Sequence, residues 1–301
     1  MIRIYTVSDK RPDFIRLQYF GFKNFLKDKD YQLIVCNNGS TPELRKQIES
    51  ICEELEITSL FVEGEYLNGA IATQVPLIYC LKNYISKDNK KDITVIIDSD
   101  IFLFAPLSFE VLLGDADIGG IYQQREVQYK RFFIRNHFYI WNALMIFRNQ
   151  TVDFDSLDIS LIQNVTDVGG RTNEYLRKFK PKIQWLFHTA DIEEEEKGIF
   201  DESLLNDYEQ SFGMQIIESS LIHYYRGSNW DLSNEEYHKK KTRFLEKLLA
   251  LANNKYPLVE EKISHYSSVV SHTRKHFNGQ RNNGKPFFNI TDRNFRLKWI
   301  S

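Results

Sequence analysis

The sequence has few cysteines and no long apolar run. Three cysteines occur among its 301 residues, and neither their odd number nor their spacing suits a disulfide framework or a paired metal motif. We therefore expect Cys36, Cys52 and Cys80 to be reduced core residues. The most apolar stretch, residues 93–107, is interrupted by two aspartates and is shorter than the about 20 residues of a membrane-spanning helix.

The opening residues also lack the features of a secretion signal. Residues 1–4, Met-Ile-Arg-Ile, run within a few positions into polar residues 8–11, without a longer apolar stretch or a small-residue cleavage site. We expect a soluble, cytoplasmic protein without a transmembrane anchor.

Charge is nearly balanced overall but unevenly placed. The formal net charge is −2, whereas residues 235–301 carry 14 Lys and Arg against 6 Asp and Glu. Net acidity speaks against a nucleic-acid-binding protein. The basic excess is typical either of a solvated helical face or of peripheral contact with an anionic membrane surface or a phosphate-bearing substrate, and both interpretations stay open.

Strands and helices alternate in the first third of the chain. Apolar patterns predict strands at residues 2–7, 31–36, 59–62 and 93–97, and helices at residues 16–26, 42–51 and 70–84. Thr41 and Pro42 are typical of a helix start. The alternation predicts an α/β fold with a mostly parallel sheet.

Beyond Phe104 the pattern becomes mixed α+β. Strands are expected at residues 118–122, 138–147 and 183–187, with helices at residues 173–179 and around the apolar stripe Phe244, Leu245, Leu248 and Leu249. We expect one domain over residues 1–234, with halves 1–104 and 105–234. Residues 235–301 would form a basic, partly helical extension packed on it.

Two carboxylates follow a strand that is apolar on both faces. Residues 93–97 lead directly into Asp98-Ser99-Asp100. Side chains two residues apart in a strand point to the same side, and open α/β sheets bind ligands at their carboxyl edge. Such a pair suits Mg²⁺ or Mn²⁺, which keeps part of its coordination shell for water and substrate phosphates. A solvated turn or a helix cap is the alternative interpretation.

The apolar run into Asp98-Ser99-Asp100, followed by Ile101-Phe102, resembles the DxD segment of GT-A glycosyltransferases. Further similar segments follow the family's order over roughly residues 2–230. They are the first strand to Thr6-Val7-Ser8, the strand into Asn37-Asn38-Gly39-Ser40, Asn68-Gly69 before a helix, and His223 ahead of Gly227-Ser228-Asn229-Trp230. The resemblance implies a Rossmann-like GT-A catalytic domain over residues 1–234. It also implies transfer of a sugar from a nucleotide-diphosphate sugar, with a UDP-sugar as the expected donor.

The resemblance implies a donor site as well. Nucleotide contacts are expected from Thr6, Ser8, Arg11, Asn37, Asn68 and Gly69, with Asp98 and Ser99 at the metal and diphosphate. Asn37 departs from the family, which often has an aspartate there for uridine. His223 would join Asp98 and Asp100 as a metal ligand, although a lone histidine is more often structural.

After His223, the resemblance places Gly227 and Ser228 at the diphosphate and Trp230 over the pocket. The lysine and proline that glycogenin-like enzymes carry before the tryptophan are absent, so Arg226 would meet the diphosphate charge.

On the acceptor side, Gln123-Gln124-Arg125 and Trp141-Asn142 resemble the walls that hold donor sugar and acceptor. A surface charge for Arg125 and a core aromatic for Trp141 are the alternatives. Asp167, ahead of two glycines and a helix, is expected either to act on the acceptor, as a general base or by orienting it, or to cap the helix.

Two further functions remain open. A nucleotidyltransferase acting on sugar phosphates also pairs carboxylates with magnesium, although no Gly-rich loop with a lysine occurs near the first strand. A non-catalytic carbohydrate-binding protein of the same fold is the other. The expected partners of a glycosyltransferase are a nucleotide-sugar donor and a carbohydrate or lipid-linked glycan acceptor.

Overall fold

Seven strands form the main sheet of the computed structural model, which describes residues 1–62, 70–129, 133–162, 165–192, 214–224, 238–239, 241–250 and 252–253. The spatial order is β3 (Thr58–Phe61), β2 (Tyr31–Asn37), β1 (Ile2–Ser8), β4 (Ile93–Asp98), β7 (Phe133–Arg148), β6 (Ile118–Tyr129) and β8 (Ile183–Leu186). Only β7 runs antiparallel to its neighbours in this sheet. The predicted α/β fold with a mostly parallel sheet is confirmed.

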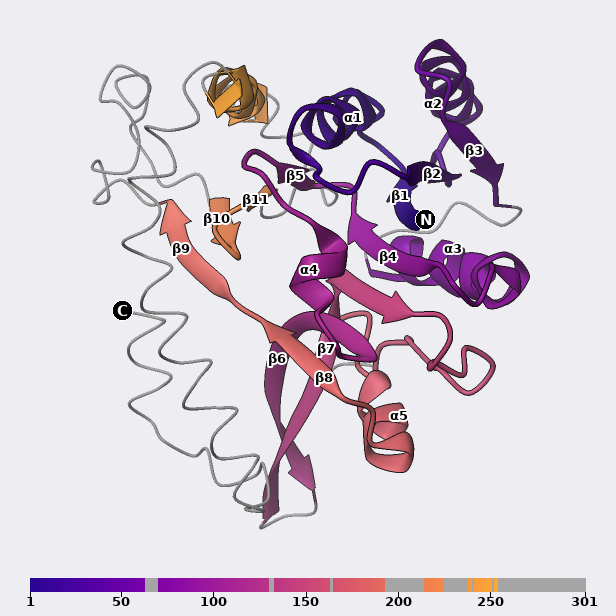
Figure 1. Cartoon of the computed structure of the whole chain (residues 1–301), viewed down its shortest axis with the longest axis vertical. Coiled ribbons are helices and arrows are strands. Elements are labelled where there is room, and N and C mark those ends of the chain that lie inside the picture. The colour runs from indigo at the N-terminus through magenta and orange to yellow at the C-terminus, as the bar shows by residue number, and fades with distance from the viewer. Residues whose placement is uncertain are drawn as a thin grey trace.

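A second, antiparallel sheet continues from the first. Its order is β5 (Ile101–Leu103), β11 (Leu221–Tyr224), β10 (Met214–Ile217) and β9 (His188–Ile192). The chain passes from β4 of the main sheet into β5 through Ser99 and Asp100. Because β8 likewise leads into β9, the two sheets are joined at two places (Figure 1).

Helices cover both faces of the main sheet (Figure 1). They are α1 (Asp13–Phe25), α2 (Pro42–Glu54), α3 (Ala70–Asn83), η1 (Ile85–Lys87), α4 (Phe109–Leu113) and α5 (Thr172–Phe179). Phe14 of α1 packs in one core cluster with Ile4 of β1, whereas Leu77 of α3 packs in another with Tyr5. Successive side chains of β1 therefore serve opposite faces, as the period of two in a strand requires.

Local sequence explains where several elements begin. Thr41 caps α2 because its side chain accepts a hydrogen bond from the backbone N–H of Leu44, and Pro42 occupies the first turn, as predicted. Strands β6 and β7 extend well beyond the predicted residues 118–122 and 138–147. The sequence did not predict this longer hairpin because residues 123–126 are polar. The paired strands satisfy each other's backbone hydrogen bonds, so the hairpin does not need an apolar run.

The predicted apolar stripe of the C-terminal region is helical and buried. Residues 241–250 form a helix, and Phe244, Leu245, Leu248 and Leu249 lie in the same core cluster as α1. Residues 254–301, the larger part of the basic extension, lie outside the described residues. Within the described part of the chain, no helix has the length and apolar character to cross a membrane.

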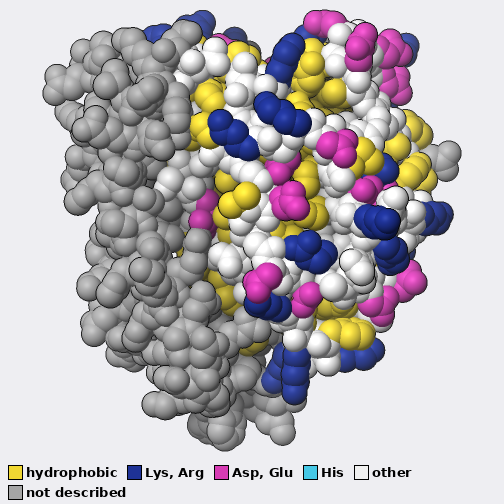
Figure 2. Space-filling view, viewed as in Figure 1, with side chains coloured by type: hydrophobic (Ala, Val, Ile, Leu, Met, Phe, Trp, Pro, Cys, Tyr) yellow, Lys and Arg dark blue, Asp and Glu magenta, His cyan; other side chains and the backbone are white. Residues whose placement is uncertain are grey.

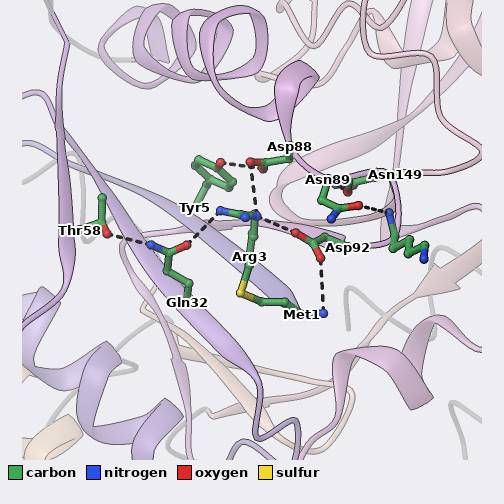
Figure 3. Close-up of polar contacts among 10 residues, drawn as sticks. Met1, Arg3, Tyr5, Gln32, Thr58, Asp88, Asn89, Asp92 and Asn149 are labelled. Atoms are coloured by element: carbon green, nitrogen blue, oxygen red, sulfur yellow. Dashed lines mark hydrogen bonds and ion pairs between the residues drawn. The ribbon is translucent and has the colours of Figure 1, made fainter.

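A polar network ties together the strand ends farthest from the carboxyl edge (Figure 3). Arg3 Nε donates to Asp92 Oδ2 at 2.8 Å, and Arg3 Nη1 donates to Gln32 Oε1 at 3.0 Å. Gln32 in turn donates to Thr58 Oγ1 at 3.0 Å, and the Tyr5 hydroxyl donates to Asp88 at 2.8 Å. These bonds connect β1, β2 and β3 to the segment before β4. They stabilise the main sheet at the edge opposite the carboxylates.

The described surface visible in Figure 2 mixes charges of both signs. Lys and Arg side chains alternate with Asp and Glu side chains across this face, with small apolar areas between them. This face therefore carries no large patch of one sign among the described residues, and the basic excess belongs to residues 235–301.

Candidate functional site

Asp98 is the last residue of β4, and Ser99 and Asp100 form a turn rather than a continuation of the strand. The expectation that strand geometry alone aligns the two aspartates was therefore wrong. The turn is instead held by Gln18, a buried residue of α1. Its Nε2 donates to the carbonyl oxygens of Asp98 at 2.8 Å and Ile101 at 3.0 Å. The two carboxylates thus lie at the point where the chain passes from the main sheet to the second sheet.

A bulge in β7 brings an amide to Asp98. The pairing of β6 with β7 jumps from Met145 to Trp141, so residues 142–144 have no partner on β6. Asn142, within this bulge, donates from Nδ2 to Asp98 Oδ1 at 2.8 Å. Burial and the neighbouring charge of Asp100 nevertheless raise the pKa of Asp98 well above its usual range. The Asn142 bond opposes this shift in pKa only in part.

His223 lies beside the second carboxylate. It sits on β11, with Nε2 3.8 Å from Asp100 Oδ1 and Nδ1 3.1 Å from Gln215 Oε1. Trp141 packs edge-on against its ring, with the ring centroids 5.0 Å apart. Burial, helped by the charge of Lys241, lowers the pKa of His223 to about 3. The imidazole is therefore neutral at neutral pH.

The donor atoms at this edge fit a divalent cation. A buried carboxylate and a neutral imidazole are ligands that Mn²⁺ accepts. Two ligands about 2.1 Å from one octahedral ion lie about 3.0 Å apart when adjacent and about 4.2 Å apart when opposite. The Asp100 to His223 separation of 3.8 Å lies between these values, so a side-chain movement of less than about 1 Å would bring both atoms onto one ion. Among the described residues, no group of three or more His, Cys, Asp or Glu side chains is arranged to hold a metal. An ion here would take its remaining ligands from substrate and water.

Asp167 and Arg125 meet on the acceptor side. Arg125 Nη2 of β6 donates to Asp167 Oδ2 at 3.1 Å, and both side chains are about half exposed. The charge of Asp167 is also a smaller cause of the raised pKa of Asp98, after burial and the charge of Asp100. The alternative role of Asp167 as a helix cap is wrong, because α5 begins after Arg171 and has no side-chain cap.

Two buried hydroxyls line the carboxyl end of β1. Thr6 and Ser8 are 0% and 1% exposed, and neither hydroxyl oxygen finds a hydrogen-bond partner within the described part of the chain. A buried polar group without a partner is costly, so a ligand or water is expected there. Register pairs Ser8 with Asn37 at the same edge.

Two more of the expected nucleotide contacts, Asn37 and Arg11, are engaged within the protein. The amide of Asn37 donates to the Arg45 carbonyl at 3.0 Å and accepts from Gly39 N–H at 3.1 Å. Arg11 binds Asp13 at 2.5 Å and Thr242 at 2.9 Å, so it joins the start of α1 to helix 241–250. Their roles toward a nucleotide stay predictions.

The remaining predicted residues divide into two groups. Ser99 lies in the turn between the aspartates, and Gln124 accepts a hydrogen bond from the Tyr122 hydroxyl at 2.6 Å. Outside the described residues lie Asn68, Gly69, Arg226, Gly227, Ser228 and Trp230.

Two glutamines that position the site were missed by the sequence analysis. Gln18 supports the carboxylate turn, and Gln215 contacts His223. A signal for Gln18 existed, because it interrupts the apolar stripe of Phe14 and Phe22 on α1. For Gln215, by contrast, the pairing of β10 with β11 had to be known.

No protein-family model and no curated protein matches the sequence. Among solved structures, the chain is similar to galactosyltransferase LgtC in complex with donor and acceptor sugar analogs, with 10% identity, 61% of this chain and 72% of that chain covered, and a TM-score of 0.38. Mannosyltransferase PcManGT from Pyrobaculum calidifontis, in complex with GDP-Man and Mn²⁺, shows 11% identity, coverage of 95% and 81%, and a TM-score of 0.41. A protein from Bacillus anthracis assigned as a glucose-1-phosphate thymidylyltransferase shows 11% identity, coverage of 62% and 87%, and a TM-score of 0.36. With TM-scores below 0.5, these likenesses do not decide the reaction.

Proposed function

We propose that this chain is a glycosyltransferase that uses Mn²⁺ or Mg²⁺ to move a sugar from a nucleotide-diphosphate sugar, with UDP as the expected nucleotide, to a hydroxyl acceptor. One observation carries the proposal. Asp100 Oδ1, in the turn after β4, lies 3.8 Å from His223 Nε2 of β11, and Asp98 ends β4 two residues earlier, at the carboxyl edge of an open α/β sheet. The order of motifs that resembles GT-A enzymes supports the same proposal, because it includes these residues although His223 lies more than 120 positions after the aspartates.

The donor would lie along the carboxyl ends of β1 and β4. Thr6 and Ser8 supply hydroxyls that can donate to and accept from a nucleoside. Asp100 and His223, with Asp98 beside them, would hold the ion, which would neutralise charge on the departing diphosphate. Gln215 accepts from His223 Nδ1–H and so leaves the Nε2 lone pair directed to the Asp100 side.

The acceptor would approach between β6 and the loop before α5. Arg125 holds the Asp167 carboxylate in a fixed direction, while the Asp167 N–H donates to the Tyr139 hydroxyl at 3.3 Å. A carboxylate held in this way can take the proton of an acceptor hydroxyl if the reaction inverts the anomeric centre. If the reaction retains that centre, the same carboxylate orients the acceptor.

A donor panel with product analysis tests the function. The full chain is incubated with single nucleotide sugars and Mn²⁺, and released nucleoside diphosphate and pyrophosphate are measured separately. Release of nucleoside diphosphate, suppressed by EDTA and restored by Mn²⁺, is the expected result. Pyrophosphate release would indicate the nucleotidyltransferase instead. Binding of donors without turnover, with every acceptor class tried, would indicate a carbohydrate-binding protein.

Asp167→Asn is expected to lower turnover on the order of a hundredfold or more while the donor Kd stays within about twofold, if Asp167 is the base. The amide keeps the shape of the carboxylate but cannot accept the proton. Steady-state rates and donor titrations measure the two quantities. Arg125→Gln is the companion variant, because it keeps the Asp167 carboxylate but removes its ion pair. A smaller loss of turnover is expected for it. A fully active Asp167→Asn variant would exclude a catalytic role.

A further inference from the structure

Two cysteine side chains meet in the core between β2 and α3. The Sγ atoms of Cys36 and Cys80 lie 2.6 Å apart, and both residues are 0% exposed. A disulfide bond is about 2.05 Å long, so the two sulfurs are already close to bonding distance. The third cysteine, Cys52, packs in a separate cluster with Val35 and Ile48. All three are free thiols in the structure.

We propose that Cys36 and Cys80 are a modification site, at which oxidation forms a reversible disulfide between β2 and α3. Cys36 immediately precedes Asn37, the last residue of β2, whose carbonyl accepts a hydrogen bond from Val62 N–H. The bond would therefore anchor α3 to the strand end that borders the candidate donor site. The proposal does not depend on which reaction the site carries out.

The disulfide is expected to stabilise the folded protein by restricting the unfolded chain. The two cysteines are 44 residues apart, and the loop between them contains α2 and β3. Cross-linking a loop of this length removes much conformational freedom from the unfolded state and little from a native state in which the sulfurs already touch. Oxidation should therefore raise the melting temperature.

The chemistry balances with a small disulfide such as glutathione disulfide as the oxidant. One cysteine thiolate attacks the small disulfide and releases one glutathione, and the second cysteine then displaces the other glutathione from the mixed disulfide. The protein loses two protons and two electrons, and the oxidant becomes two glutathione molecules. Contact with Cys80 and burial raise the pKa of the Cys36 thiol well above its usual range. Exchange in the folded protein is therefore slow and proceeds through local opening.

Peptide mapping of the full chain tests the site. The protein is refolded from denaturant in a glutathione redox buffer, remaining thiols are alkylated, and the linked peptides are identified by mass spectrometry. Trypsin alone leaves Cys52 and Cys80 in one peptide, because residues 47–81 contain no Lys or Arg. Additional cleavage after glutamate separates them. The expected product is a Cys36 to Cys80 link with Cys52 alkylated, together with a melting temperature several degrees above that of the reduced protein.

Variants make the outcome specific. Cys80→Ala should abolish both the link and the increase in melting temperature, whereas Cys52→Ala should retain both. The peptide map of the unmutated chain decides the matter even if Cys80→Ala folds poorly. Complete alkylation of all three cysteines, stable glutathione adducts without a link, or links to Cys52 as frequent as the expected one would overturn the proposal.

Discussion

Replacing Asp98 or Asp100 by asparagine is expected to weaken manganese-dependent donor binding on the order of a hundredfold or more, because each change removes an anionic group from the candidate metal site. Titration calorimetry with Mn²⁺ and nucleoside diphosphate measures the effect. His223→Ala should weaken binding less, since a neutral ligand attracts the cation less than a carboxylate does. Asp155→Asn, at an exposed position away from the site, is the matched control. Unchanged affinity in both aspartate variants would refute the metal assignment.

The same Asp98→Asn change is expected to stabilise the metal-free protein at neutral pH. Because the pKa of Asp98 is raised in the folded state, the folded protein holds this proton more tightly than the unfolded chain does. Stability is therefore lost as pH rises from the ordinary Asp range through the raised value. Asparagine cannot ionise and escapes this loss. Melting curves in EDTA should show an advantage for the variant that grows with pH above about 4.

A destabilised Asp98→Asn variant would have a different meaning. It would show that the carboxylate is stabilised in the native protein beyond its bond from Asn142, for which asparagine can substitute through its own oxygen. Loss of binding together with gain of stability is the pattern expected of a residue kept for function rather than for folding.

Gly169→Ala is expected to destabilise the protein by about 3 kcal/mol or more. Gly169 has φ of +96°, and a Cβ atom there would lie 2.1 Å from the Ile140 carbonyl oxygen. Relief requires movement of β7 next to Asn142, whose backbone N lies 3.2 Å from that Cβ position. Donor binding should therefore weaken as well. Thermal melts and the same calorimetric titration measure the two losses.

Gly114→Ala separates strain from crowding. Gly114 has φ of +59°, but the nearest atom to an added Cβ is the Val111 carbonyl oxygen at 4.0 Å. With ψ of −128° this conformation is one that glycine adopts far more easily than alanine, so the variant carries only the cost of the backbone conformation, about 1 to 3 kcal/mol. Equal destabilisation of the two alanine variants would show that close packing against β7 is not what makes Gly169 necessary.

Several residues of the candidate site were chosen from local signals in the sequence, and their functional roles stay predictions. The apolar run ending in Asp98 predicted both a buried strand and its carboxyl edge. His223 was found through the order of motifs rather than through its own pattern. Asp167 was selected for the glycines that follow it, but its partner Arg125 was chosen independently and only the hairpin pairing brings them together.

Other features had no such signal. The length of β6 and β7 was underestimated, because polar side chains on a paired hairpin break the apolar period that marks a strand. The turn at Ser99 and Asp100 was taken for strand, since a chain that changes sheets has the same local composition as one that continues.

By itself, the sequence determined the alternation of strands and helices, the mostly parallel sheet and the position of two carboxylates at its edge. These follow from side-chain periodicity, which is a property of neighbouring residues. Only the tertiary structure decided that Asp100 faces His223, that Asn142 binds Asp98 from a bulge and that Cys36 touches Cys80. Each of these contacts joins residues far apart in the chain. Such contacts depend on strand order and register, which no local pattern encodes.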